Sequence, residues 1–324
     1  MSNPLHPLAI LWEIRNCQGN SARLGKAARK DGNGGFVPDI SRQDCDIRKN
    51  IAYANHDGVE LLGDLYLPTG QGPFPLLINV HGGYWRRGTR ETFAHWGPYL
   101  AARGYAGFTI TYRLTKPGKK TYPEAVHDVR AAVQFMRGRA GDFRIDPERI
   151  ALWGNSAGAQ LAALVALAGD SELFAGGYPQ DSHAALSTKV KVLVGVYGIY
   201  DLIAQWRHSQ IGNPGDNLVE SFLGCSPMAD RRRYFDASPI SHAITGNNKT
   251  AVYLSWGTED DVVDHRTQSM EFLLALKQAG FAVRTCVMHG APHYWLSDPI
   301  EEPGSYPGFL APRLLRFLGE QLNP

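Results

Sequence analysis

The chain has 324 residues, 44% of them hydrophobic, and its 33 basic and 31 acidic side chains give a formal net charge of +2. This apolar content supports a sizeable core and argues against general disorder, and the balanced charge without a basic stripe argues against nucleic-acid binding. No segment approaches the roughly 20 apolar residues of a membrane span, and the four widely spaced cysteines predict reduced thiols in a cytoplasmic protein with no membrane partner.

Residues 1–48 differ in composition from the rest of the chain. They lack the basic start, long apolar run and cleavage site of a signal peptide, and residues 19–35 are rich in Gly, Lys, Arg and Asn. We therefore predict an N-terminal arm that precedes one globular domain at residues 49–324. The apolar stretch Leu8–Trp12 predicts a short helix that docks on this domain or on the second subunit of a homodimer, and a mobile tail is the alternative.

From Ile51 onwards the sequence alternates between strand and helix patterns. Asp57-Gly58 separates two β-prone runs and predicts a hairpin. Later strands are expected at residues 76–80, 105–112, 149–153, 190–196, 252–256 and 283–288, and helices at residues 92–103, 122–139, 157–168, 267–279 and 307–322. This alternation predicts an α/β fold with a mostly parallel sheet and helices on both faces. The long irregular stretch 198–248 predicts a cap-like insertion.

A G-x-S-x-G pattern at residues 154–158 lies between a predicted strand and a helix rich in Ala and Leu. The glycines at its ends let strand and helix pass close together and leave the hydroxyl of Ser156 exposed at the corner, which is the geometry of a nucleophile elbow. An ordinary loop serine between chance glycines is the alternative for this motif taken alone, so its partners must decide.

A serine hydroxyl needs a base to activate it and a group that orients the base. The loops after the last two predicted strands contain Asp260 and His293, and the order Ser156, Asp260, His293 is the one that this architecture uses. His293 would take the serine proton, and Asp260 would hold the imidazole in the correct tautomer. Each residue taken singly could be a solvated charge or a hydrogen-bonded histidine. The rivals for these two roles are Asp261, Asp264 and His289.

The sequence His81-Gly82-Gly83-Tyr84-Trp85 follows a predicted strand and indicates an oxyanion loop. Glycine lets backbone N–H groups approach a reacting oxygen without interference from a Cβ atom. The predicted oxyanion donors are the N–H groups of Gly82, Gly83 and Ala157, and His81 is expected to brace the loop. A plain strand-to-loop turn is the alternative. The predicted substrate-binding residues are the aromatic side chains Tyr84, Trp85 and Trp206.

The motifs H-G-G-Y-W, G-N-S-A-G, G-T-E-D-D-V-V and G-A-P-H, in this order, resemble those of α/β-hydrolases of the esterase/lipase group. Over about residues 50–322 the chain is similar to hormone-sensitive-lipase-like and feruloyl-esterase-like carboxylesterases, and H-G-G-Y-W also resembles kynurenine formamidases. The resemblance implies the α/β-hydrolase fold, the triad and the oxyanion donors named above. Tyr84 stands where many lipase-like members have another glycine, which favours the feruloyl-esterase and formamidase side.

The expected function is that of a serine carboxylesterase, which hydrolyses small to medium esters, aromatic ones included, through an acyl-enzyme. An arylformamidase with the same triad is one alternative, and a hydrolase-fold binding protein without activity is another. The expected partner is a small-molecule ester. No metal ligand set and no phosphate-binding glycine loop is found in the sequence, so no cofactor is expected.

Overall fold

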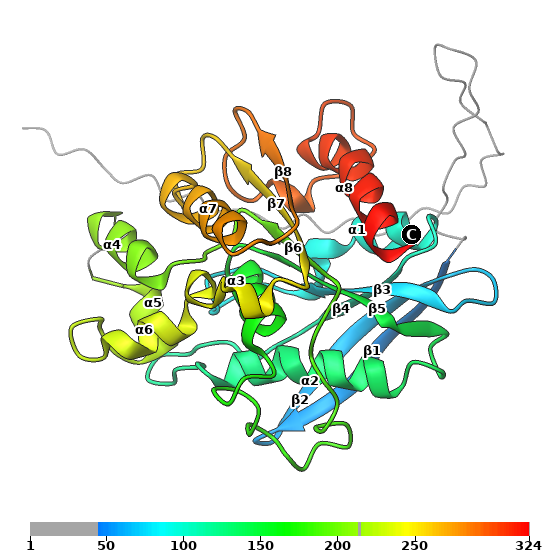
Figure 1. Cartoon of the computed structure of the whole chain (residues 1–324), viewed down its shortest axis with the longest axis horizontal. Helices are drawn as coiled ribbons and strands as arrows, with labels where there is room; N and C mark the ends of the chain where they lie inside the picture. Colours follow the sequence, from blue (N-terminus) through cyan, green and yellow to red (C-terminus); the bar gives the residue numbers. More distant parts are fainter. Residues whose placement is uncertain (1–44, 213–214, 324) are drawn as a thin grey trace, which may run out of the picture. The chain divides into compact units, whose positions relative to one another are not determined.

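The computed structural model describes residues 45–212 and 215–323, which build one eight-stranded sheet (Figure 1). Its strands are β1 Cys45–His56, β2 Val59–Pro68, β3 Phe74–Val80, β4 Ala106–Ile110, β5 Ile145–Asn155, β6 Val192–Val196, β7 Ala251–Gly257 and β8 Val283–Met288. The strand order is β1-β2-β4-β3-β5-β6-β7-β8. Only the pairs β1–β2 and β2–β4 of these strands are antiparallel, so the prediction of a mostly parallel sheet is confirmed.

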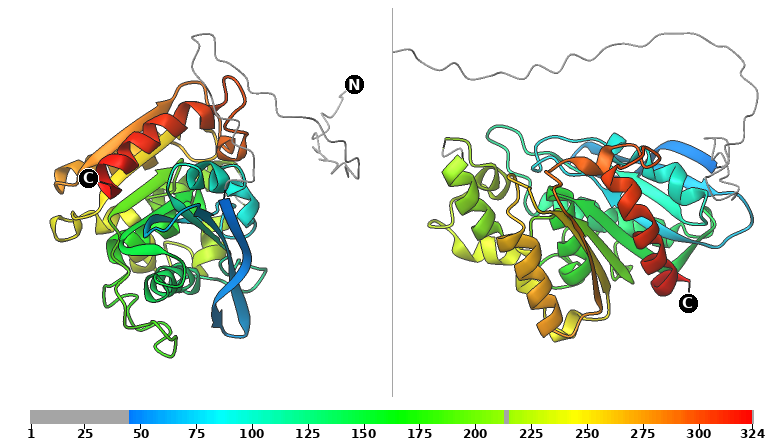
Figure 2. Two further views of the ribbon diagram at one scale, coloured as in Figure 1. Left: turned by 90° about the vertical axis from the view of Figure 1, so that its right-hand side faces the viewer. Right: turned by 90° about the horizontal axis from the view of Figure 1, so that it is seen from above.

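Helices cover both faces of the sheet (Figure 2). On one face, α1 (Trp96–Ala101) and α8 (Tyr306–Leu322) pack against the strand side chains that point toward them, and together they form a core. On the other face, α2 (Glu124–Gly138), α3 (Ala157–Ala168) and α7 (Glu271–Gln278) pack over a larger core. Every residue of α3 is buried, because this helix is apolar except for Gln160 and lies at the centre of its layer.

The helix predicted at residues 92–103 is broken into a 3₁₀ turn, η2 (Arg90–Phe93), and the short α1. Phe93, the last residue of η2, and Trp96, the first residue of α1, both pack edge-on against the buried Trp153 of β5, with ring centroids 5.2 and 4.7 Å away. Similarly, the helix predicted at 267–279 starts as a π-helical turn, η5 (Arg266–Met270), before α7.

The stretch between β6 and β7 is more regular than its sequence predicts. It contains three short helices, α4 (Leu202–Gly212), α5 (Leu218–Leu223) and α6 (Arg231–Ala237), and two 3₁₀ turns, η3 (Pro239–His242) and η4 (Thr245–Asn247). Asn217 and Asp230 cap α5 and α6 by accepting backbone N–H groups of their first turns. The sequence did not predict α5 and α6, because six or seven residues are too few to show a helical period.

The sheet begins within the last residues of the predicted arm. Strand β1 begins at Cys45, so the last residues of the predicted arm 1–48 belong to the sheet. The rest of the arm, with the predicted docking helix Leu8–Trp12, lies outside the described residues. Among the helices that the structure describes, none has the length and apolar character to cross a bilayer.

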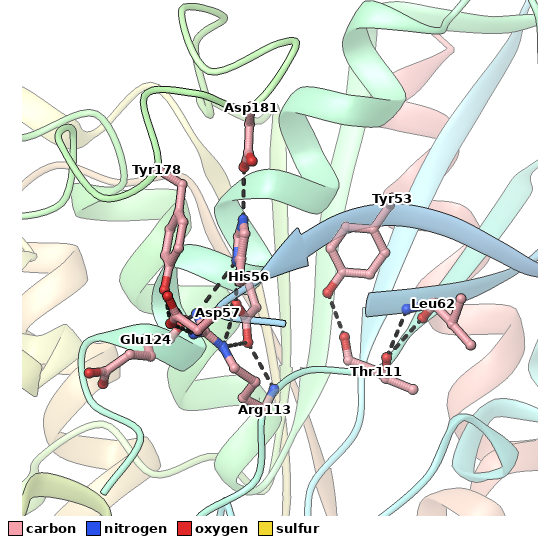
Figure 3. Close-up of polar contacts among 10 residues, drawn as sticks. Tyr53, His56, Asp57, Leu62, Thr111, Arg113, Glu124, Tyr178 and Asp181 are labelled. Atoms are coloured by element: carbon pink, nitrogen blue, oxygen red, sulfur yellow. Dashed lines mark hydrogen bonds and ion pairs between the residues drawn. The ribbon is translucent and has the colours of Figure 1, made fainter. Parts of the chain in front are cut away.

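A buried charge cluster joins the hairpin, α2 and the segment after α3 (Figure 3). The ring of His56 is fully buried, and its Nδ1 lies 2.7 Å from Asp128 Oδ1 while its Nε2 lies 2.8 Å from Asp181 Oδ2. An ionised carboxylate can only accept hydrogen bonds, so this arrangement favours a proton on both ring nitrogens, the imidazolium form of His56. The other charged or titratable groups that face His56 are Arg113, Asp57 and Tyr178.

This cluster is expected to lose stabilising energy as pH rises. Burial alone would lower the pKa of His56, but its hydrogen bonds to Asp128 and Asp181 and their charges outweigh burial and raise it above 6.5. A pKa raised by folding stabilises the protein fully below the unfolded value and loses that effect as pH rises through the folded value. Each pKa unit by which the folded value exceeds the unfolded value contributes about 1.4 kcal/mol to the free energy of unfolding.

The test is urea unfolding at pH 6 and pH 9. The free energy of unfolding of the wild type should fall between these values, and Asp181→Asn, which removes one of the two carboxylate partners, should show a smaller fall. Equal falls in both proteins would contradict the role of His56.

Candidate active site

Ser156 lies at the corner between β5 and α3 with φ 52° and ψ −125°. A non-glycine residue rarely adopts this conformation, which is held here by the close packing of strand and helix. A Cβ atom at Gly158 would come within 2.1 Å of the carbonyl oxygen of Val80, and one at Gly154 within 2.2 Å of the carbonyl oxygen of Gly158. Glycine is therefore required at both positions for the corner to form.

The three residues predicted as a triad lie in one line of contacts. Ser156 Oγ is 3.0 Å from His293 Nε2, and His293 Nδ1 is 2.6 Å from Asp260 Oδ2. The second carboxylate oxygen, Oδ1, accepts the backbone N–H groups of Val262 and Val263 at 3.0 and 2.9 Å. When Nδ1–H donates a hydrogen bond to the carboxylate, the imidazole presents Nε2 as an acceptor for the serine proton.

The rival residues lie elsewhere. The side chain of Asp261 is exposed, as is that of His289. Asp264 accepts the N–H of Arg266 at the start of η5. Among the described residues, no group of three or more His, Cys, Asp or Glu side chains is placed to hold a metal ion.

The predicted oxyanion donors differ in their availability. The Gly82 N–H donates to Asn155 Oδ1 at 3.0 Å, so in this conformation it is not free to bind a reacting oxygen. Within the described part of the chain, the N–H groups of Gly83 and Ala157 carry no hydrogen bond. Gly82 therefore fixes the loop, and of the three predicted donors only Gly83 and Ala157 have N–H groups available for an oxyanion.

The buried side chain of His81 supports the predicted oxyanion loop. Burial lowers the pKa of its imidazole to about 4, so the ring is neutral, and its Nδ1 lies 2.8 Å from the carbonyl oxygen of Gly82. The ring of Tyr112 stacks on it with centroids 4.5 Å apart, and the Tyr112 hydroxyl donates to the His81 carbonyl oxygen at 2.9 Å. This agrees with the bracing role expected from the sequence.

The aromatic residues predicted to bind substrate lie at three different places. Tyr84 is half-buried, and its hydroxyl donates to the carbonyl oxygen of Val262, two residues after the acid. Trp206 is half-buried in α4, and its Nε1 donates to Glu220 within the insertion. Trp85 is fully buried, so the prediction that it contacts substrate is wrong for this conformation. The physical reason is a stack of its indole on Phe222.

Further residues around the triad were not assigned from the sequence. Tyr197 packs its ring against the His293 imidazole with centroids 4.4 Å apart, and its hydroxyl accepts from Asn155 Nδ2. Tyr294 places its ring edge-on to His293 at 4.5 Å and is 51% exposed. Tyr197 and Tyr294 have positive φ angles, which no sequence pattern signals for tyrosine. Gln160 was also not assigned. The one sequence signal for it is its spacing of one helical turn from Ser156, which places the two residues on the same side of α3.

The comparisons with known proteins agree with this geometry. The family model BD-FAE matches residues 63–276. The "Probable carboxylic ester hydrolase LipM" of Mycobacterium tuberculosis (strain ATCC 25618 / H37Rv) is 30% identical over 193 residues, 58% of this chain and 42% of that protein. "Esterase LipQ" of the same strain is 30% identical over 264 residues, 79% of this chain and 59% of that protein. The chain thus spans about half the length of these curated relatives.

Solved structures share the fold. The thermophilic esterase Est2 of Thermogutta terrifontis superposes with a TM-score of 0.68 at 23% sequence identity, over 87% of this chain and 94% of that one. The predicted α/β-hydrolase fold is therefore confirmed.

Proposed function

The chain belongs to the BD-FAE family, and from this premise we propose that it is a serine carboxylic ester hydrolase. The observation that carries the proposal is the line of contacts from Ser156 Oγ through His293 to Asp260, with separations of 3.0 and 2.6 Å. The names of the relatives, a carboxylic ester hydrolase and an esterase, support the same reaction class. We propose the triad roles as the sequence predicted them.

The reaction proceeds in two halves. In the first, His293 Nε2 takes the hydroxyl proton while Ser156 Oγ attacks the ester carbonyl carbon. The carbonyl oxygen becomes an oxyanion, which the N–H groups of Gly83 and Ala157 stabilise. His293 then gives its proton to the leaving alkoxide oxygen as the C–O bond breaks, and the acyl group stays on Ser156.

In the second half, a water molecule replaces the alcohol. His293 takes one of its protons, and the oxygen attacks the acyl carbon and forms a second oxyanion. The bond to Ser156 Oγ breaks, the proton returns to Oγ, and the carboxylic acid leaves. Throughout, Asp260 accepts a hydrogen bond from Nδ1–H of His293 and stabilises the charged imidazole. These steps use no cofactor, and we propose that none is needed.

Aromatic esters are the proposed substrate subclass. The half-buried Tyr84 and the half-exposed Tyr294 flank the site, Tyr84 from the oxyanion loop and Tyr294 beside His293. Aromatic side chains offer large apolar faces on which an aryl or cinnamoyl group can stack.

The three helices of segment 198–248 are proposed as a cap of the catalytic domain 49–324. We place the protein in the cytoplasm, with no nucleic-acid partner, while the homodimer stays a prediction.

The proposal is tested on a panel of p-nitrophenyl acetate, p-nitrophenyl butyrate, methyl cinnamate and N-formylkynurenine. We expect kcat/KM on the esters to exceed that on N-formylkynurenine. The opposite order would assign the protein as an arylformamidase. A folded protein that hydrolyses none of them and does not react with a fluorophosphonate would be a hydrolase-fold binding protein.

A further inference from the structure

Gln160 lies one turn after Ser156 on α3, and both halves of its buried amide are hydrogen-bonded. Its Oε1 accepts the indole Nε1–H of Trp85 at 2.8 Å, and its Nε2 donates to the carbonyl oxygen of Ala237 at 2.8 Å. Trp85 belongs to the oxyanion loop and Ala237 is the last residue of α6. One side chain on the helix of the nucleophile therefore contacts both the oxyanion loop and the proposed cap.

The indole of Trp85 is held on two sides. Gln160 holds its N–H, and Phe222 of α5 stacks on its ring with centroids 4.4 Å apart and an interplanar angle of 7°. Tyr84 and Trp85 both have positive φ angles, 53° and 57°. Two successive non-glycine residues in this region persist only when their surroundings determine their position. The contacts of the buried indole with Gln160 and Phe222 hold this part of the loop in position.

Trp85 belongs to the same tight turn as the proposed oxyanion donor Gly83. The N–H groups of Arg86 and Arg87 donate to the Gly83 carbonyl oxygen at 3.1 and 3.0 Å, which closes a tight turn around Tyr84 and Trp85. Asn155 holds the loop at Gly82, before this turn. The second oxyanion donor, Ala157, lies on α3 itself, so the two donors are aligned only when loop and helix keep a fixed relation.

We propose that Gln160 is a positioning residue for ester hydrolysis, which acts through Trp85 to align the oxyanion loop with Ser156. The inference rests on the proposed function. Gln160 does not contact the reacting atoms, and its effect is expected on the chemical step rather than on substrate binding, because an oxyanion forms only after the attack.

The test is a double-mutant cycle of Gln160→Met and Trp85→Phe. Methionine keeps the length of the side chain but removes both hydrogen bonds, and phenylalanine keeps a ring against Phe222 but removes the N–H. Each single variant should lower kcat on p-nitrophenyl acetate about tenfold and change KM less than about twofold, since small misplacements of catalytic groups have effects of this size or larger. The double variant should be no slower than the slower single variant, because both changes remove the same Trp85–Gln160 hydrogen bond.

The matched control is Gln134→Met in α2. Gln134 is also a buried glutamine, and its Nε2 donates to the carbonyl oxygens of Ala184 and Leu186 at 2.8 and 2.7 Å. This variant should lose thermal stability and keep kcat within about twofold of the wild type, which separates a general loss of stability from a loss of alignment.

Three results would overturn the inference: a kcat of Gln160→Met equal to that of Gln134→Met, a rise in KM at constant kcat, or effects of Gln160→Met and Trp85→Phe that multiply in the double variant.

The rate of fluorophosphonate labelling is measured in parallel. A wild type that labels but hydrolyses no ester refutes the proposed function alone, and the labelling rates then decide the role of Gln160. If Gln160→Met fails to fold, Trp85→Phe must show the drop in kcat or labelling by itself, and its absence refutes the role. A wild type that neither hydrolyses nor labels refutes both proposals.

Discussion

Replacing Ser156 with alanine is expected to lower kcat on p-nitrophenyl acetate by roughly 10⁶-fold, to the level of the remaining oxyanion donors and substrate binding. The reason is that, among the residues that the structure describes, no other hydroxyl is hydrogen-bonded to His293 Nε2. The Ser156 Oγ is the oxygen within 3.0 Å of His293 Nε2, and its elbow conformation depends on the two glycines beside it. The variant should also lose covalent labelling by a fluorophosphonate, measured by the mass of the intact protein.

The control for this variant is Ser171→Ala, beyond the end of α3. The Ser171 hydroxyl donates to the carbonyl oxygen of Ala168 and contacts no triad residue. Its kcat should stay within about twofold of the wild type. Near wild-type turnover in Ser156→Ala would place the nucleophile elsewhere and refute the triad.

Replacing Asp260 with asparagine is expected to lower kcat about 10⁴-fold, through the tautomer of the base. The backbone N–H groups of Val262 and Val263 both donate to Oδ1, so an asparagine must turn its oxygen toward them. Its NH₂ group then faces His293 Nδ1, which has to become an acceptor and moves the imidazole proton to Nε2. A protonated Nε2 cannot accept the hydroxyl proton of Ser156.

The comparison variant is Asp261→Asn, with the same chemical change one residue further along. The Asp261 side chain is exposed, so its kcat should remain within about twofold of the wild type. Steady-state kinetics of both variants on p-nitrophenyl acetate give the answer. A larger loss in Asp261→Asn would transfer the acid role to that residue.

Sequence patterns were most informative where a feature is contiguous. The elbow is five residues long, and the requirement for glycine at 154 and 158 follows from steric contacts within the same strand-helix unit and its neighbour strand. Strands β3 to β7 were predictable because buried parallel strands form short apolar runs. The broken helix at residues 90–101 was not, because its form depends on the packing of Phe93 and Trp96 against Trp153.

The aromatic residues show the same division at the site. Tyr84 and Trp85 are neighbours in a motif, and both were predicted to bind substrate from their types alone. In the structure one is half-buried beside the acid loop, and the other is fully buried behind it. Tyr294 was not singled out for binding, although its exposed ring lies against His293. Side-chain direction follows from backbone angles and neighbours, which a residue type does not encode.

By itself, the sequence determined the fold class, the elbow at Ser156 and the loops that carry Asp260 and His293, because periodicity, glycine spacing and chain order are local or sequential properties. Only the tertiary structure decided that Asp260 rather than Asp261 contacts His293, that the Gly82 N–H is already bonded and that Gln160 holds Trp85. These contacts join residues 33, 73 and 75 positions apart. Their partners are chosen by packing of the folded chain, and no pattern within one segment specifies them.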